Sequence, residues 1–310
     1  MIDKPGIYDD ISEADYHADP VAPMPSLSSS IAKLMVSRSP LHAWFNHPGL
    51  NAAKATEVDK PTKAMDIGTA AHKIILGEGK ALQIIEAADY RSKDAQVARD
   101  AARAAGRVPI LKADYARVNE LAEAALAQIA CTELAGIFDA GTPEATLAWM
   151  EGPSWCRARV DWLPQHARAG GHITVVDLKT TGGSAHPDDW ARTAFDMGYD
   201  VQAVFYERGL RALIPGVRSV KFKFLVIEQE PPYALSINEM SGQALAEGQE
   251  LVRLGIEAWT ECMKRDEWPG YPSASTVIDP PKWRSDRTEI RRLALLDRIG
   301  RWQRPLEAAE

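Results

Sequence analysis

Three apolar strand-like segments follow one another closely in the middle of the chain, and they limit the fold more than any other feature of the sequence. They read ATLAWM, WCRARVDWLP and HITVVDL, end at residues 150, 164 and 178, and are separated by Gly-Pro and by the turn at 168–171. The elements predicted after them are a helix at about 187–213, strands at 219–228 and 233–238, and a helix at about 241–265. This order predicts an α/β protein with a mixed β-sheet flanked by helices, because a doubly wound sheet requires regular alternation of strand and helix.

The sequence before these strands is mostly helical. We expect residues 1–25 to form an extended arm, because they contain several prolines and glycines and little periodicity. The first predicted helices are one near Ser26 or Ser28, either of which can cap it, and one from Pro40 through Phe45. A loop is expected at 49–62, followed by helices at about 63–77, 92–106 and 112–131. The expected organisation is an arm at 1–25, one domain at 26–268 with a helical part at 26–135 and a sheet core at 140–268, and a Pro-rich link with a basic helix at 269–310.

Composition and cysteine usage narrow the class of protein. With 45% hydrophobic and 25% charged residues in 310, the chain has the composition of a soluble protein. No apolar run approaches the roughly 20 residues that span a bilayer, and the acidic N-terminus lacks the features of a signal peptide. Cys131, Cys156 and Cys262 form no CxxC pair and are fewer than the four thiolates that hold an iron–sulfur cluster. We expect a cytoplasmic protein with reduced, packed cysteines, without a membrane span and without such a cluster.

The charge of the chain is unevenly distributed. Eight basic and three acidic residues between 281 and 304 give that segment a formal charge of +5, which leaves −12 for the remainder of a chain whose net charge is −7. Such a segment is either a solvated helix face or a surface that contacts DNA or another subunit.

Two of the predicted strands end in acidic residues. Alternation along 155–164 puts Arg157, Arg159 and Asp161 on one face, and Asp177 and Lys179 likewise share a face of the following strand. If the two strands form a hairpin across the turn at 164–172, Asp161 and Asp177 can converge. Two convergent carboxylates with open water positions are typical of a Mg²⁺ or Mn²⁺ site.

Neighbouring groups complete a possible site for phosphodiester hydrolysis. The carbonyl of Leu178 offers a third oxygen ligand, and Lys179 can orient an attacking water or stabilise developing charge. A bare [DE]xK triplet is weak evidence, since the chain contains another, Glu78-Gly79-Lys80, which follows a predicted helix and has no paired aspartate. The triplet at Asp177 differs because it ends an apolar strand that follows another strand ending in aspartate.

Two helical pairs at spacing i, i+4 accompany these strands. Gly68 and His72 share one helix face, and Gln202 and Tyr206 share a face of the helix after the DLK strand. Taken alone, each pair is explained as well by packing as by function.

The ordered series GxxxH, RxD, DxKTT and QxxxY resembles the RecB-like branch of the PD-(D/E)xK nuclease superfamily, and within it the exodeoxyribonuclease VIII (RecE) type of phage and prophage exonuclease. The resemblance extends from about Ser26 to Trp268. It implies a restriction-endonuclease-like sheet with an N-terminal helical elaboration. The family's Pro-Asp reads Val160-Asp161 here, and the cysteines of some relatives are missing.

The resemblance also implies roles for individual residues. These are His72, Asp161 and Asp177 as metal ligands, Glu144 as a further acidic ligand, Lys179 as the catalytic lysine, and Gln202 and Tyr206 as supports of the site or DNA contacts. The implied activity is a Mg²⁺-dependent DNA exonuclease, with Mn²⁺ as a substitute, that resects linear duplex ends in phage-type recombination. A ring-shaped homo-oligomer and a single-strand annealing protein as partner are implied as well.

Two other functions stay open at this point. One is a catalytically inactive DNA-binding or scaffold subunit on the same fold, which would have no physical need for the intact Asp161, Asp177 and Lys179. The other is a metal-dependent nuclease that acts on RNA or on particular DNA structures rather than on ends.

Overall fold

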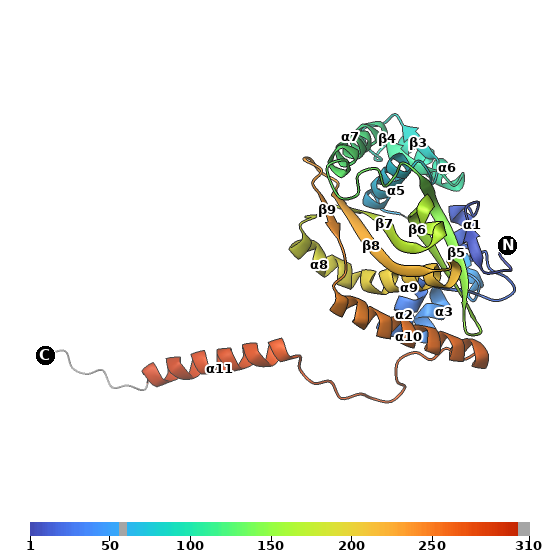
Figure 1. The fold of residues 1–310 in the computed structure, drawn as a ribbon. Coiled ribbons are helices and arrows are strands. Elements are labelled where there is room, and N and C mark those ends of the chain that lie inside the picture. The colour runs from blue at the N-terminus through green and yellow to red at the C-terminus, as the bar shows by residue number, and fades with distance from the viewer. Residues whose placement is uncertain (56–60, 303–310) are drawn as a thin grey trace. The chain divides into compact units, whose positions relative to one another are not determined.

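A mixed sheet of seven strands lies at the centre of the first of two units, Met1–Gly270 and Tyr271–Glu310, in the computed structural model, which describes residues 1–55 and 61–302 (Figure 1). Six strands follow one another in the order β1-β5-β6-β7-β8-β9, and β2 pairs with β6 at the side. Their bounds are β1 Gly6–Tyr8, β2 Leu27–Ser28, β5 Gly141–Glu151, β6 Ser154–Pro164, β7 Gly171–Thr181, β8 Val217–Glu228 and β9 Leu235–Asn238. The predicted α/β class with a mixed sheet is confirmed.

The direction of the strands follows from the lengths of their connections. The short turns after β5 and β6 produce antiparallel neighbours, whereas β7 and β8 run parallel because two helices connect them. These helices are α8 (Pro187–Asp196) and α9 (Tyr199–Leu213). The sequence predicted one helix at 187–213. Gly198 divides it because its φ of 67° is left-handed and cannot continue an α-helix.

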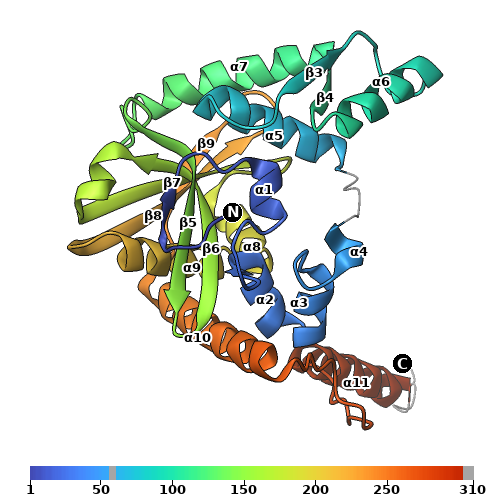
Figure 2. The same cartoon turned by 90° about the vertical axis from the view of Figure 1, so that its right-hand side faces the viewer.

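Helices cover both faces of the sheet (Figures 1 and 2). On one face, helix α9 packs with α2 (Ser29–Ser37), α3 (Pro40–Asn46) and α10 (Gly242–Arg265) over a core that contains Trp149, Phe205 and Trp259. On the other face, α5 (Lys63–Leu76) and α7 (Lys112–Ile129) cover a second core, which contains Leu121, Leu178 and Leu225. Because each strand alternates its side chains between the two cores, both faces exclude water.

The helical part resembles its prediction, with a small sheet and a short helix in addition. Helix α2 starts after Ser28, whose Oγ accepts a hydrogen bond from the amide of Ile31, as the capping argument requires. Between α5 and α7 lie α6 (Lys93–Ala104) and a small parallel sheet of β3 (Leu82–Ile85) and β4 (Val108–Leu111), which the sequence did not predict. A short helix, α4 (Ala52–Ala55), lies in the segment 49–62 that we expected to be a loop, and residues 56–60 of that segment lie outside the described residues.

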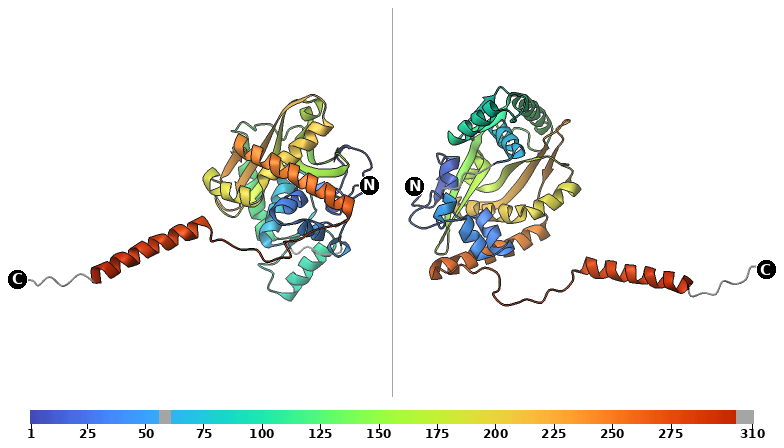
Figure 3. Two further views of the ribbon diagram at one scale, coloured as in Figure 1. Left: turned by 90° about the horizontal axis from the view of Figure 1, so that it is seen from below. Right: turned by 180° about the vertical axis from the view of Figure 1, so that it is seen from behind.

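Residues 1–25 differ from the extended arm that the sequence predicted. Strand β1 pairs with β5, helix α1 (Glu13–His17) follows, and Ile2 forms a β-bridge with Val21. Ile2 and Val21 are buried beside Trp155 in a third, small apolar cluster. Contacts with the sheet hold this segment in place. Its own elements are too short to be predicted from the local sequence. Figure 3 shows this N-terminal segment against the sheet from two further sides.

The second unit contains helix α11 (Lys282–Trp302), which agrees with the predicted basic helix. Its large apolar side chains are exposed, for example Trp283, Ile290 and Leu293. Of the three cysteines, Cys156 and Cys262 are buried as expected, but Cys131 is exposed. None of the described helices is both long and apolar enough to cross a membrane.

Candidate active site

Strands β6 and β7 separate from each other near the middle of the sheet. Strand β7 pairs with β8 along its full length, whereas its ladder with β6 consists, within the described part of the chain, of the pair Trp162↔Val176. Beyond this pair the amide of Leu178 donates its hydrogen bond to Asp161 Oδ2, at 2.8 Å. The carboxylate of Asp161 therefore binds the edge of β7 where a backbone carbonyl would do so in a regular hairpin.

A second distortion lies on the other side of Asp161. The ladder of β5 and β6 contains Pro143↔Trp162 and Ala145↔Val160 but not the intervening pair of Glu144 and Asp161. Glu144 has a φ of 55°, a left-handed conformation that is uncommon for a residue with a side chain. Strained backbone of this kind often occurs at functional sites.

Helix α5 brings an imidazole to the same place. His72 Nε2 lies 2.6 Å from the carbonyl oxygen of Leu178, and its Nδ1 lies 3.8 Å from Asp161 Oδ2. The helix can approach β7 this closely because Gly68 faces Thr180, and a Cβ at Gly68 would lie 2.9 Å from Thr180 Oγ1. The GxxxH pattern thus has a physical explanation, in which the glycine allows the approach and the histidine reaches the strand.

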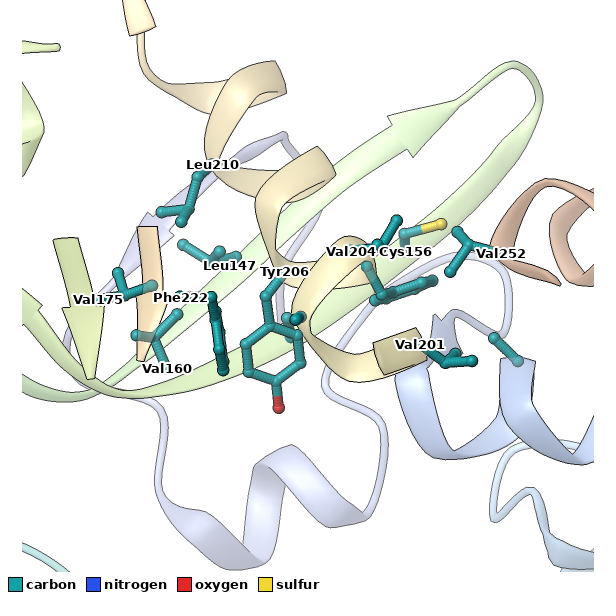
Figure 4. Close-up of a cluster of buried hydrophobic side chains, with 14 of the residues drawn as sticks. Leu147, Cys156, Val160, Val175, Val201, Val204, Tyr206, Leu210, Phe222 and Val252 are labelled. Carbon is teal, nitrogen blue, oxygen red and sulfur yellow. The ribbon is translucent and has the colours of Figure 1, made fainter. Parts of the chain in front are cut away.

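Helix α9 holds the second aspartate. Gln202 Nε2 donates a hydrogen bond to Asp177 Oδ1 at 2.7 Å, and Asp177 is only 1% exposed. One turn later, the ring of Tyr206 packs edge-on against Phe222 at 5.6 Å between centroids, while its hydroxyl points away from the apolar cluster (Figure 4). Burial first, and then the nearby Tyr16, raises the pKa of Tyr206 well above its usual value, so the phenol stays neutral.

Lys179 forms an ion pair with Asp177 Oδ2. Burial alone would lower the pKa of Lys179, but the charges of Asp177 and Asp161 outweigh this effect and raise it. The lysine is therefore a cation that can stabilise negative charge and not a general base.

The remaining electrostatics favour binding of a cation. Burial, followed by the charge of Asp177, raises the pKa of Asp161 well above its usual range. Burial, followed by the charge of Lys179, lowers the pKa of His72, which keeps the imidazole in the neutral form that ligates metals. The carboxylates of the site outnumber its cations. Arg159 is paired with Glu144, so Lys179 alone has to balance the charges of Asp161 and Asp177.

The donor atoms present fit a hard divalent cation. Ligand atoms of His72, Glu144 and Asp161 lie within 4.8 Å of one another. The buried Asp177 Oδ2 is in direct contact with the Lys179 ammonium, and no hydrogen bond from another described residue reaches it. A carboxylate oxygen with a single ionic contact keeps lone-pair capacity that a metal ion can use. Carboxylate oxygens with one imidazole suit Mg²⁺ or Mn²⁺.

One cleft of about 410 Å³ contains the whole constellation. All eight residues predicted from the sequence line it, namely His72, Glu144, Asp161, Asp177, Leu178, Lys179, Gln202 and Tyr206. The structure thus brings them together, while their roles stay predictions. The other triplet, at 78–80, lies in the loop after α5, where Lys80 pairs with Glu13 at 2.8 Å.

Sequence reasoning missed one wall of this cleft. Glu13, Tyr16 and His17 of helix α1 line it, together with Arg159 of strand β6. Arg159 lies 5.7 Å from the ring centroid of Tyr16 and donates a hydrogen bond to the carbonyl of Ile11 at 2.9 Å. The arginine of the RxD pattern was a signal that could have been followed, whereas nothing in the first 25 residues pointed to the site.

Comparison with known proteins agrees with this geometry. A family profile described as "PDDEXK-like domain of unknown function (DUF3799)" matches residues 28–279. No curated protein sequence matches the chain.

Solved structures that are similar to the chain include two exonucleases. One is a "Putative exonuclease" from Eubacterium rectale, with a TM-score of 0.52 and 12% identity over 88% of this chain and 94% of that one. The other is a phage related exonuclease from Haemophilus somnus 129PT, with a TM-score of 0.30 and 13% identity over 78% of this chain and 97% of that one. At such identities the first likeness concerns the fold alone, and the second carries no structural argument.

Proposed function

The chain belongs to the DUF3799 family of PDDEXK-like domains, and from this premise we propose that it is a divalent-metal-dependent DNA exonuclease that hydrolyses phosphodiester bonds at the ends of linear duplex DNA. The observation that carries the proposal is the buried surplus of carboxylates beside Lys179 in one cleft. A surplus of this kind is completed by a proton or by a bound cation, and a protonated lysine next to it suits a reaction in which negative charge develops.

The ligand set would consist of Asp161, Asp177, His72, the Leu178 carbonyl and Glu144. When bound, the cation supplies Lewis acidity and lowers the pKa of a bound water. Mg²⁺ is the proposed physiological ion, with Mn²⁺ as substitute, because oxygen donors dominate the set.

The side chains of the chain itself have separable tasks. Gln202 fixes the carboxylate of Asp177 through the 2.7 Å hydrogen bond to Oδ1. Asp161 is fixed by the amide of Leu178. Lys179 is held as a cation at the cleft, where it can stabilise the charge that develops on the phosphoryl oxygens. Tyr206 stays a neutral phenol, which supports α9 and can donate a hydrogen bond.

The action on duplex ends, the part in phage-type recombination, a ring-shaped oligomer and an annealing protein as partner are supported by the resemblance of GxxxH, RxD, DxKTT and QxxxY to the RecE-type exonucleases. An inactive scaffold subunit on the same fold is less well supported, because it would gain nothing from burying unbalanced carboxylates.

The test is cleavage of end-labelled linear duplex DNA, with a covalently closed circle of the same sequence as the matched substrate. We expect progressive loss of the linear DNA with Mg²⁺ or Mn²⁺, intact circles, and DNA binding without turnover in Ca²⁺. Cleavage that continues in excess EDTA would contradict the metal mechanism. Cleavage of circles or of RNA at the same rate would instead indicate a metal-dependent nuclease that acts on RNA or on particular DNA structures.

A further inference from the structure

The first turn of α9 contacts both charged residues of the DLK strand. Gln202 holds Asp177, as described above, and Tyr199, three residues earlier, lies against Lys179. The Lys179 ammonium nitrogen lies 4.8 Å from the centroid of the Tyr199 ring, within the range of a cation–π interaction. The QxxxY pattern includes Gln202 and Tyr206, whereas Tyr199 lies outside it and has no role in the site described so far.

The ring of Tyr199 is itself held rigidly. It stacks with Trp190 at 5.6 Å and an interplanar angle of 24°, and with Phe224 at 5.4 Å and 25°. Phe224 is the residue of β8 opposite Asp177 in the parallel ladder. The aromatic surface is thereby fixed to the same pair of strands that carries the site.

The backbone places Tyr199 at the first position of its helix. Gly198, with its left-handed φ of 67°, ends the path of α8 and allows α9 to start in a new direction. The left-handed φ is the reason that a glycine is favoured there, because the Lys33 side chain, 2.8 Å from a Cβ built at Gly198, is flexible and can move. Tyr199 and Gln202 are then one turn apart on the helix and face the same strand.

We propose that Tyr199 is a positioning residue that holds the ammonium of Lys179 in the cleft, an inference that rests on the proposed function. Lysine carries its charge on a flexible four-carbon stem, so its position must be fixed by contacts. In the structure Asp177 supplies one such contact. A cation bound to Asp177 would compete with Lys179 for that carboxylate, whereas the attraction of an aromatic face does not depend on Asp177. Tyr199 therefore keeps the lysine in place when the metal site is loaded.

The experiment compares Tyr199→Leu, which removes the aromatic face, with Tyr199→Phe, which keeps it. Trp190→Leu is the matched control, since it removes a ring of the same stack that does not contact Lys179 and leaves Tyr199 stacked on Phe224. We expect Tyr199→Leu to lower the single-turnover rate on the order of tenfold, the scale of a partly desolvated cation–π interaction, while affinities for Mn²⁺ and DNA stay unchanged. Tyr199→Phe and Trp190→Leu should cleave at nearly the wild-type rate. An equal loss in all three variants, or no loss in Tyr199→Leu, would overturn the proposal.

A second measurement does not depend on activity. Lys179 is acylated at fixed pH with an amine-directed reagent, with and without Mn²⁺, and its modification is quantified by mass spectrometry. We expect faster labelling of Lys179 in Tyr199→Leu, most of all with Mn²⁺ bound, and wild-type labelling in Tyr199→Phe. If the wild-type protein cleaves no nucleic acid, the proposed function fails, and this labelling still decides whether the ring holds the lysine. Equal labelling in all variants would refute that contact.

Discussion

Strand β6 carries two clusters of buried charge that differ in one respect. The arginine cluster consists of Asp19, Ser26, His47 and Arg157. The acidic site consists of His72, Glu144, Asp161, Asp177 and Lys179. Arg157 and Asp161 are four residues apart on the same strand, yet the first cluster is balanced in charge and the second is not. The difference shows which buried charges serve stability and which are available for chemistry.

In the arginine cluster acid and base are matched one to one, although Nε of Arg157 has no hydrogen-bond partner among the described residues. Asp19 accepts hydrogen bonds from the amide and the hydroxyl of Ser26, and Arg157 donates to the carbonyl and hydroxyl of Ser26 and lies 3.1 Å from Asp19. His47 accepts from the amide of Gly49 through Nδ1, so its Nε2–H donates to the carbonyl of Ser26. Burial first lowers the pKa of His47, which keeps this histidine neutral. One acid faces one base, and the cluster anchors the N-terminal segment to the sheet.

In the acidic site the carboxylates are not neutralised. Asp161 and Asp177 share the charge of Lys179, and burial, followed by the charge of Asp177, raises the pKa of Asp161. A balanced cluster needs no ligand, whereas an acidic one is completed by a proton or a metal ion.

The largest expected effects come from substituting the two charged residues of the DLK strand, Asp177 and Lys179, one at a time. Asp177→Ala should remove both cation binding and all measurable cleavage, because it deletes a ligand. Lys179→Ala should fold, bind Mn²⁺ and DNA, and lose on the order of a hundredfold or more in rate, the scale for one positioned electrostatic group. Single-turnover cleavage, Mn²⁺ binding and thermal unfolding are measured together. Near wild-type cleavage by a folded Lys179→Ala protein would refute the assignment.

Breaking the balanced cluster should affect stability instead. Arg157→Met leaves Asp19 buried without its partner and should lower the free energy of unfolding by about 3–5 kcal/mol. The double variant with Asp19→Asn should recover part of this loss. The control is Arg168→Met, which breaks an exposed ion pair with Asp9 and should cost less than about 1 kcal/mol. Chemical denaturation gives the values, and a loss as small as that of Arg168→Met would mean that the cluster does not anchor the N-terminal segment.

The smallest expected effect is a pH dependence of the metal-free protein. The pKa of Asp161 is raised above its ordinary value of 3.8, so the stability that its proton contributes is fully present below pH 3.8 and is lost as pH rises through the folded-state pKa. Asp161→Asn should therefore become increasingly more stable than the wild type as pH rises, when both are unfolded thermally in EDTA. The lowered pKa of His72 acts in both proteins and largely cancels. If the difference in melting temperature between Asp161→Asn and the wild type did not change with pH, the site would not hold an excess of buried carboxylate.

The sequence predicted the elements whose signals are local and long. Strands β5 to β8 and the helices α5, α7 and α10 agree closely with their predicted ranges, because alternation and helical periodicity extend over many residues there. Strands β3 and β4, with four residues each, and the short β1 and α1 were missed, since so few residues carry too little periodicity. The wall formed by Tyr16 was missed for the same reason, whereas the pairing of Arg159 with Glu144 was missed because it forms between two strands.

The sequence by itself determined which chemical groups reach the middle of the sheet. Period-two alternation placed Asp177 and Lys179 on one face, and Gly68 and His72 shared a helix face, because these relations are fixed by the geometry of a single element. The tertiary structure alone decided how the groups meet. The separation of β6 from β7, the left-handed backbone of Glu144 and the hydrogen bond from Leu178 to Asp161 arise between elements. Whether a buried charge is balanced, as at Arg157, or left for a cation, as at Asp161, depends on which partners are within reach, and only the folded chain brings those partners together.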